Sequence, residues 1–275
     1  MSTQSMQGVN VLLIGPSGSG KTHAVRTFLE AGITPFCVFT EPGYETLGDL
    51  EPHKVHWHYL PPAIQSWAEM MDMASKVNNL SLESLSKLGD INKRANAQLI
   101  KFYELCNNFV CQRDGKSYGD VAKWGTDRVL VVDSLTGLND MAMGLQVGNK
   151  PVRSQADWGV AQNVLEFCIK KLTMDTKCHF LLIAHVEREV DEVLGGNKIM
   201  VATLGKKLAP KIPLNFSDVI LTVKQGDKFT WSTANVQADL KTRNLRIAEG
   251  LNPSFLPIIE SWKKHGGVIS PTVAS

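Results

Sequence analysis

One short segment near the start of the chain carries the residue types that bind phosphate. Residues 15–22 read GPSGSGKT and match the pattern G-x-x-x-x-G-K-[ST] at every position. Glycines let successive backbone N–H groups turn inward around phosphate oxygens, and a helix beginning beside them points the positive end of its dipole at the same anion. Lys21 would reach the β- and γ-phosphates, and the Thr22 hydroxyl would face Mg²⁺. The predicted contacts of a nucleoside triphosphate are Gly15, Pro16, Ser17, Gly18, Ser19, Gly20, Lys21 and Thr22.

A carboxylate that ends an apolar run is the second candidate for this chemistry. Asp133 closes the run RVLVVD at 128–133. Ligands of open α/β sheets bind beyond the carboxyl ends of the strands, where such a carboxylate can hold a Mg²⁺-bound water. The alternative is an Asp that caps the turn or helix containing Ser134 and Thr136. Because a phosphate loop requires a metal-binding group, we predict that Asp133 and Thr22 bind the metal.

Hydrolysis also needs a group that orients and deprotonates water. Glu41 directly follows the apolar run at 35–40, so it should lie at the same sheet edge as Asp133. Glu45, four residues further on, is the alternative base. His185 follows the run HFLLIA at 179–184, where a polar side chain could sense the γ-phosphate. A buried, hydrogen-bonded histidine is the competing interpretation.

Apolar runs separated by amphipathic segments must position these groups. Buried strands are expected at 11–14, 35–40, 54–59, 128–133 and 179–184, and a helix at 22–31 that Gly32 ends. Strands that alternate with helices indicate a parallel sheet with right-handed crossovers. Two further runs, 219–223 and 229–232, flank a glycine-containing turn and predict an antiparallel hairpin. The predicted fold class is therefore α/β, with a mostly parallel sheet and a C-terminal hairpin.

The stretch 75–126 has a different pattern and is expected to be a helical insertion within a single domain spanning 1–275. One apolar stripe of a long helix is predicted from three- and four-residue steps between Ile91, Ala95, Leu99, Phe102, Cys106 and Phe109. Before it, Pro61 and Pro62 are expected to open a helix that carries Trp67. After it, Trp158 is assigned to the buried face of another helix.

Composition limits the classes of protein that remain. The formal net charge is +2 over 275 residues, which excludes a globally basic nucleic-acid coat and leaves only a local patch. The five cysteines form no C-x-x-C pair, which favours free thiols in a reducing compartment. No run approaches the ~20 apolar residues of a membrane span. We therefore expect a protein that works in the cytoplasm, without a membrane partner.

In their order, these motifs resemble the RecA-like ATPases. More narrowly, they resemble the phage nucleotide-binding proteins that include the RecA-like single-strand annealing (Sak) type and related AAA family ATPases. The similarity covers roughly 8–247, apart from the insertion. It rests on GPSGSGKT, Thr40-Glu41, VLVVDSLTGL at 129–138, IAH at 183–185, Gly-Lys-Lys at 205–207 and Lys241-Thr242-Arg243.

The resemblance implies ATP as the bound nucleotide and gives roles to several of these residues. Glu41 would activate the attacking water, although Pro42 and Gly43 depart from the usual surroundings. His185 would couple the nucleotide state to the loop that follows it, where glutamine or asparagine is more usual. Lys241 and Arg243 would reach the γ-phosphate of a neighbouring subunit, which implies a homo-oligomer in the form of a ring or filament.

Two segments would bind single-stranded DNA if the resemblance holds. They are the loops expected at 140–157 and 186–207. The first contains Lys150 and Arg153 among glycines, whereas the second contains four cations but also begins with four acidic residues. Flexible loops with cations can follow a phosphate backbone. A solvated loop without a ligand is the competing interpretation.

Four functions fit this set of residues. The first is an ATPase that acts on single-stranded DNA in phage recombination or annealing. The second is a DNA-related motor or loader, such as a helicase-like or packaging ATPase. A small-molecule kinase is the third, but the chain has no arginine-rich lid segment. The fourth is a nucleotide-gated interaction protein with little turnover.

Overall fold

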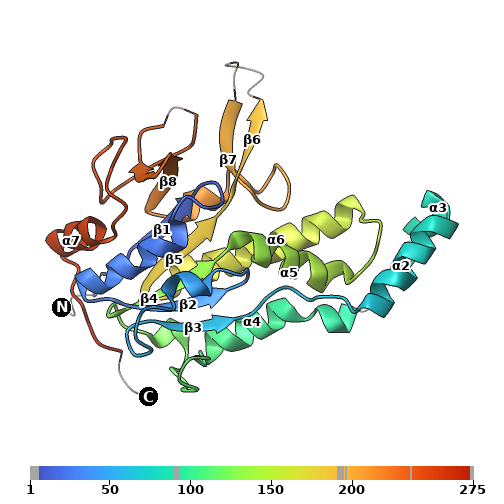
Figure 1. Ribbon diagram of the computed structural model, residues 1–275, viewed down its shortest axis with the longest axis horizontal. Helices are drawn as coiled ribbons and strands as arrows, with labels where there is room; N and C mark the ends of the chain where they lie inside the picture. The colour runs from blue at the N-terminus through green and yellow to red at the C-terminus, as the bar shows by residue number, and fades with distance from the viewer. Residues whose placement is uncertain (1–5, 90–92, 191–194, 196, 236, 273–275) are drawn as a thin grey trace.

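The core of the protein is a seven-stranded sheet with helices on both faces (Figure 1). The computed structural model describes residues 6–89, 93–190, 195, 197–235 and 237–272. The strand order is β3-β2-β4-β5-β1-β8-β9, and every neighbouring pair is parallel except β8 and β9. The strands are β1 Asn10–Ile14, β2 Thr34–Phe39, β3 His56–Tyr59, β4 Arg128–Asp133, β5 His179–Ala184, β8 Asp218–Gln225 and β9 Lys228–Ser232. The predicted parallel sheet and C-terminal hairpin are confirmed.

The central strands β1, β2, β4 and β5 are buried along nearly their whole length because both faces of the sheet are covered there. One face packs against α4 (Gln98–Asn107), α5 (Leu135–Val147) and α6 (Gln155–Met174). The other packs against the 3₁₀ helix η1 (Val25–Ala31) and α7 (Leu256–Lys264). Alternate residues of each central strand enter the two separate hydrophobic clusters. Successive side chains of these strands therefore alternate between the two faces. The sequence does not show an alternation of apolar and polar residues, because both faces of the central strands are buried.

The helix after the phosphate loop differs from the expected one. α1 (Lys21–Ala24) is a single turn, and the rest of the predicted helix, to Ala31, is η1. Gly32 ends it with φ 77°, as expected of a residue that must adopt the left-handed conformation. Phe28 of η1 stacks on Phe255, with ring centroids 4.1 Å apart. This contact joins the segment to the start of α7.

The helical stretch between β3 and β4 was predicted less accurately. Pro61 and Pro62 do not open a helix. Instead, α2 (Trp67–Asn79) begins after Ser66, whose hydroxyl accepts from the Glu69 amide in a capping box. The remaining short helices are α3 (Leu82–Ser86) and the 3₁₀ helices η2 (Tyr44–Leu47), η3 (Lys93–Asn96), η4 (Val121–Lys123) and η5 (Ile212–Asn215).

The predicted apolar stripe does not lie on one long helix. Only Leu99, Phe102 and Cys106 of that stripe belong to α4; Ala95 lies in η3, and Phe109 follows the helix. Ile91 lies outside the described residues. No residue of α2 is buried, and α2 and α3 extend away from the sheet (Figure 1). None of the helices in the described part of the chain has the length and apolar character needed to cross a membrane.

A second, two-stranded sheet projects from the same body (Figure 1). β6 (Val186–Val190) begins directly after His185 and pairs in antiparallel fashion with β7 (Asn197–Val201). Val201 is buried, whereas β6 has no buried residue. The chain returns to the core just after β7, where the Ala202 amide donates to the His185 carbonyl at 2.9 Å.

Candidate nucleotide-binding site

The phosphate loop connects β1 to α1 at the carboxyl edge of the sheet. Gly18 and Gly20 have φ of 68° and 83°, values that L-residues with a side chain rarely adopt. A Cβ on Gly15 would overlap the Thr222 hydroxyl of β8. That hydroxyl lies 2.6 Å from the Ser19 hydroxyl and donates to the Ile14 carbonyl at 3.1 Å. The loop is thus held against β8 by close contacts that its glycine positions permit.

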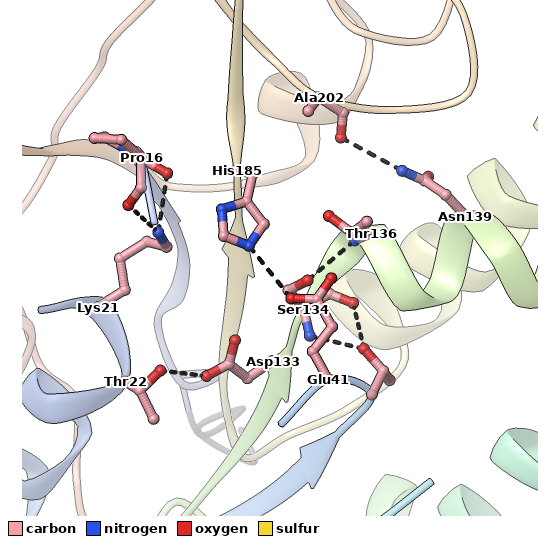
Figure 2. A network of polar contacts seen from close by, with 12 residues as sticks. Pro16, Lys21, Thr22, Glu41, Asp133, Ser134, Thr136, Asn139, His185 and Ala202 are labelled. Atoms are coloured by element: carbon pink, nitrogen blue, oxygen red, sulfur yellow. Dashed lines mark hydrogen bonds and ion pairs between the residues drawn. The ribbon is translucent and has the colours of Figure 1, made fainter. Parts of the chain in front are cut away.

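Lys21 is folded back over its own loop. Its ammonium donates to the carbonyls of Gly15 at 2.9 Å and Pro16 at 2.7 Å (Figure 2). Burial lowers the pKa of Lys21, while the charges of Asp133 and Glu41 oppose that shift. The cation is therefore placed between a carbonyl cradle and two carboxylates, next to the space that the loop encloses.

Thr22 and Asp133 meet directly. The Thr22 hydroxyl donates to Asp133 Oδ2 at 2.6 Å, although the two residues come from α1 and from the end of β4. Burial raises the pKa of Asp133, against the lowering effects of this hydrogen bond and of Lys21. A hydroxyl and a carboxylate side by side form the oxygen donor set that Mg²⁺ prefers, so these residues fit the predicted metal.

Glu41 and His185 form the next pair. His185 Nε2 lies 3.3 Å from Glu41 Oε2 (Figure 2). The hydrogen bond with His185 is the main reason that the pKa of Glu41 is lowered, and burial opposes it. Glu45, the alternative base, is exposed in η2 and does not line the cleft described below.

The neighbouring backbone is fixed by a reciprocal contact between the ends of β2 and β4. The Thr40 hydroxyl donates to the Ser134 carbonyl at 2.9 Å and accepts from the Ser134 amide at 2.8 Å. Gly137 of α5 packs onto the same Thr40, so closely that a Cβ at this position would overlap the threonine side chain. These contacts hold the residues before Glu41 and after Asp133 together.

Four of the predicted groups meet because the four strands that carry them are adjacent. In the order β2-β4-β5-β1, each strand is followed by one part of the site: Glu41, Asp133 (the last residue of β4), His185 and the phosphate loop. They line a cleft of about 780 Å³. The structure thus brings together the phosphate loop, Glu41, Asp133 and His185.

The residues of one wall of the cleft were not predicted from the sequence. Asp227, Lys228 and Phe229, from the β8–β9 turn and the start of β9, line it together with Pro253. A Cβ on Gly20 would come within 3.2 Å of the Phe229 ring. The turn around Gly226 was recognised as a hairpin, but nothing in its residue types indicated that the hairpin lies beside the phosphate loop.

Lys241 and Arg243 are not brought to this cleft. Lys241 forms an isolated bridge with Val219, and the Arg243 amide donates to Asp218 Oδ1 at 3.0 Å. Both contacts are at the amino end of β8, whereas the phosphate loop follows the carboxyl end of its parallel neighbour β1. Within one chain these two cations therefore lie toward the other edge of the sheet.

The two segments expected to be loops are mostly regular structure. Residues 140–147 belong to α5 and 155–157 to α6, so the first loop is confined to 148–154. The second segment is the β6–β7 hairpin followed by a turn; Asp191 and Glu192 lie outside the described residues. Of its cations, Lys198 pairs with Asp239 at 2.7 Å, and Lys206 pairs with Glu189 at 3.1 Å.

Trp158 is not a core residue. It is 36% exposed near the start of α6, and the Arg153 guanidinium lies 5.9 Å from its ring centroid. Gln162, one helical turn later, donates to the Leu204 carbonyl at 2.6 Å. Because positions four apart share a helix face, the Arg153–Trp158 pair lies beside the turn that follows β7.

Comparisons with known proteins agree with this geometry at the level of the family. Residues 7–244 match the model of a family described as an AAA domain. A comparison with curated protein sequences finds no match. Among solved structures, the crystal structure of the RadB recombinase is similar at 17% identity over 90% of this chain and 86% of that chain, with a TM-score of 0.36. Likeness at that level does not bear on function. The family match covers most of the chain, and the chain therefore belongs to the AAA domain family of P-loop nucleoside triphosphatases.

Proposed function

We propose that the protein hydrolyses ATP with Mg²⁺ and uses the cycle to act on single-stranded DNA, in phage recombination or annealing within the host cytoplasm. The observation that carries this proposal is the convergence of the phosphate loop, Asp133, Glu41 and His185 on one cleft. A phosphate cradle alone would suit any nucleotide-binding protein. The carboxylate–imidazole pair opposite it adds a group that can activate water.

In this proposal the Lys21 ammonium gives up its hydrogen bonds to backbone carbonyls and forms new ones to phosphate oxygens. The ammonium donates to the Gly15 and Pro16 carbonyls and would turn toward the β- and γ-phosphates of bound ATP. Thr22 and Asp133 would hold Mg²⁺, which supplies charge neutralisation at the phosphate oxygens when bound. The Thr22–Asp133 hydrogen bond holds the two oxygen donors next to each other.

Glu41 would be the base, and His185 would position it. The lowered pKa keeps Glu41 ionised at neutral pH, so it can accept a proton from the attacking water. The contact with His185 Nε2 fixes the carboxylate at the edge of the cleft. Glu45 is exposed and is not among the described residues that line the cleft. We therefore assign the role of the base to Glu41.

DNA would bind where the two predicted segments adjoin. Arg153 and Trp158 offer a cation and an exposed aromatic face, the two elements that bind a phosphate backbone and stack on bases. The segment that follows β7 lies beside them through Gln162 and Leu204. Lys198 and Lys206 already have carboxylate partners, so the proposal depends on Arg153 and Trp158 rather than on these lysines.

Lys241 and Arg243 would act on a neighbouring subunit in a ring or filament. Their position away from the cleft of their own chain is what a contribution in trans requires. Arg243→Ala should then lose activity, and mixing it with Lys21→Ala should restore part of that activity. Rescue follows because a Lys21→Ala subunit still offers Arg243 to the intact phosphate loop of its neighbour. Arg246→Ala, three residues away and also exposed, is the matched control.

Phosphate release with and without single-stranded DNA tests the main proposal. Wild-type protein should release phosphate faster with DNA, Lys21→Ala should release none, and Glu41→Gln should bind ATP but turn over about 10²–10⁴-fold more slowly. Glu45→Gln is the control for Glu41. ATP turnover that requires Lys21 but ignores DNA would retain the ATPase and exclude the DNA-linked function. Transfer of phosphate to an added metabolite would indicate a kinase.

A further inference from the structure

Three potential metal ligands gather at the opposite edge of the sheet from β9, and none of them lines the cleft assigned to the nucleotide. They are His56 of β3 and two residues of the following insertion, Cys111 and Asp114. Their donor atoms, one nitrogen, one sulfur and one carboxylate oxygen, all lie within 4.8 Å of one another. β3 is the edge strand of the sheet, so the cluster lies where the insertion meets the core.

The imidazole of His56 has an unpaired nitrogen that faces this cluster. His56 is only 4% exposed, and its buried Nδ1 atom has no hydrogen-bond partner among the residues that the structure describes. Asp114 Oδ2 lies 3.6 Å from this nitrogen, which is too long for a hydrogen bond. Leaving a buried ring nitrogen without a partner costs free energy. An atom bound between His56 and Asp114 would remove this cost.

Cys111 and Asp114 lie on a tight turn that directs both side chains to the same place. The Gly115 amide donates to the Cys111 carbonyl at 3.0 Å, and Gly115 adopts φ 70°. Within the turn, the Arg113 amide donates to Cys111 Sγ at 3.3 Å. This contact from an amide helps to fix the direction of the sulfur, as outer contacts of metal ligands do. The sequence C-x-x-D-G thus builds a two-ligand turn.

The Asp114 carboxylate is also held in its orientation by a hydrogen bond from Tyr118. The Tyr118 hydroxyl donates to Asp114 Oδ2 at 2.6 Å. Such a hydrogen bond to a carboxylate is the usual outer contact of a metal ligand. The Asp114 side chain is 18% exposed, which gives water access to a remaining coordination position.

We propose that His56, Cys111 and Asp114 bind one divalent cation of the zinc class. A thiolate and a carboxylate together balance its two charges, and the mixed N, S and O donor set suits Zn²⁺ or Co²⁺ rather than Mg²⁺ or Ca²⁺. Tetrahedral bonds of about 2.0–2.3 Å place ligand atoms about 3.3–3.8 Å apart, which brackets the His56–Asp114 distance. Water completes the coordination.

The bound ion would fasten the insertion to the edge strand. The segment that carries Cys111 already follows β3: the Gln112 amide donates to the Trp57 carbonyl at 2.8 Å, and His58 Nδ1 lies 2.8 Å from the Val110 carbonyl. Three metal bonds across the same junction would resist separation of the two segments. In this proposal the ion holds the insertion to β3 and binds independently of ATP.

Cobalt binding tests the site in the full-length protein. Co²⁺ added to metal-free protein should bind at one ion per chain and give a thiolate-to-cobalt charge-transfer absorption. Cys111→Ser should abolish that absorption, and Asp114→Asn should weaken Co²⁺ binding about 10-fold or more. Zn²⁺ should displace the cobalt signal and raise the melting temperature of the wild-type protein, but not that of Cys111→Ser.

Cys106→Ser is the matched control, because Cys106 is a partly exposed thiol of the same insertion outside the cluster. It should keep the full cobalt spectrum. The proposal is overturned if wild-type protein gives no thiolate-to-cobalt absorption, or if Cys111→Ser binds Co²⁺ as tightly as the wild type does. Metal-free circular dichroism of each variant shows whether loss of binding reflects loss of the fold.

Discussion

His185 and Ala202 are joined by a backbone hydrogen bond of 2.9 Å that closes the base of the β6–β7 hairpin. The imidazole of the same His185 contacts Glu41, and the Ala202 carbonyl accepts from Asn139 Nδ2 of α5 at 3.4 Å (Figure 2). A shift of the Glu41–His185 pair on phosphate binding would thus move the hairpin base and α5 directly. Contiguous contacts of this kind can carry coupling between two sites.

Removing the imidazole should separate ATP turnover from its response to DNA. In His185→Ala, stimulation of phosphate release by single-stranded DNA should fall about 5-fold or more, because the link from Glu41 to the hairpin is lost. Steady-state phosphate release across a DNA titration measures this. His265→Ala, at an exposed histidine after α7, should respond to DNA as the wild type does. Equal stimulation in His185→Ala and the wild type would contradict the coupling.

The same contact predicts a pH effect on catalysis. Glu41 serves as a base only when ionised, and its pKa is lowered mainly by the hydrogen bond with His185. Loss of that bond should raise the pKa, so the acid limb of single-turnover phosphate release should move to higher pH in His185→Ala. His185→Gln retains an N–H donor and should move the limb less. A limb that stays in place in His185→Ala would show that Glu41 is not the titrating base.

Asp133 should make the nucleotide-free fold less stable as pH rises. Its pKa is raised by burial, so the folded chain holds that proton more tightly than the unfolded chain does. The stabilisation is complete below the unfolded pKa and is lost as pH rises through the folded one. At neutral pH, Asp133→Asn should therefore raise the free energy of unfolding. Urea denaturation at several pH values measures this.

The same substitution should have the opposite effect once nucleotide is present. In Asp133→Asn a neutral amide replaces the carboxylate and is a poorer partner for Mg²⁺, so affinity for Mg·ATP should fall about 10-fold or more. Asp175→Asn, at an exposed carboxylate just after α6, should change neither stability nor affinity appreciably. If Asp133→Asn proved less stable than the wild type without nucleotide, the burial cost inferred for Asp133 would be contradicted.

Sequence alone predicted the site better than its surroundings. The phosphate loop, Asp133, Glu41 and His185 each follow a continuous apolar run, and the carboxyl ends of parallel strands meet at one edge of a sheet. Their convergence therefore needed only the strand assignments. The Phe229 wall could not be found in this way, because it depends on which strand pairs with β1, and residue types within β8 and β9 do not specify that neighbour.

The wrong predictions of helix boundaries and of burial fall in the amphipathic segments. Pro61 and Pro62 have the residue types of a helix start, but the capping box at Ser66 sets the start of α2 instead. Glycines suggested a loop around Gly144, yet this residue lies inside α5, where packing outweighs its low helix propensity. Trp158 has the spacing of a core residue, but it is exposed because only part of α6 contacts the sheet.

Two glycines in neighbouring helices should respond oppositely to alanine. A Cβ on Gly137 would overlap Thr40, whose hydroxyl joins β2 to Ser134, so Gly137→Ala should lower the free energy of unfolding by about 1–3 kcal/mol. Gly159 of α6 has open space around the same position, and Gly159→Ala should raise it by about 0.4–1 kcal/mol. Urea denaturation compares both with the wild type. If the two substitutions changed the free energy of unfolding equally, the Thr40 side chain would have moved aside without destabilising the fold.

Trp158 provides the sharpest test of the proposed DNA surface. If bases stack on this exposed ring, Trp158→Ala should weaken binding of single-stranded DNA by about 1–3 kcal/mol, while Arg153→Ala should weaken it and also reduce its dependence on salt. Trp67→Ala, at the 79% exposed tryptophan of α2, is the control for a general loss of surface aromatics. Fluorescence anisotropy of a labelled oligonucleotide with ATP present measures all three. Binding that depends on Trp67 instead would move the DNA site from α6 to the projecting helix α2.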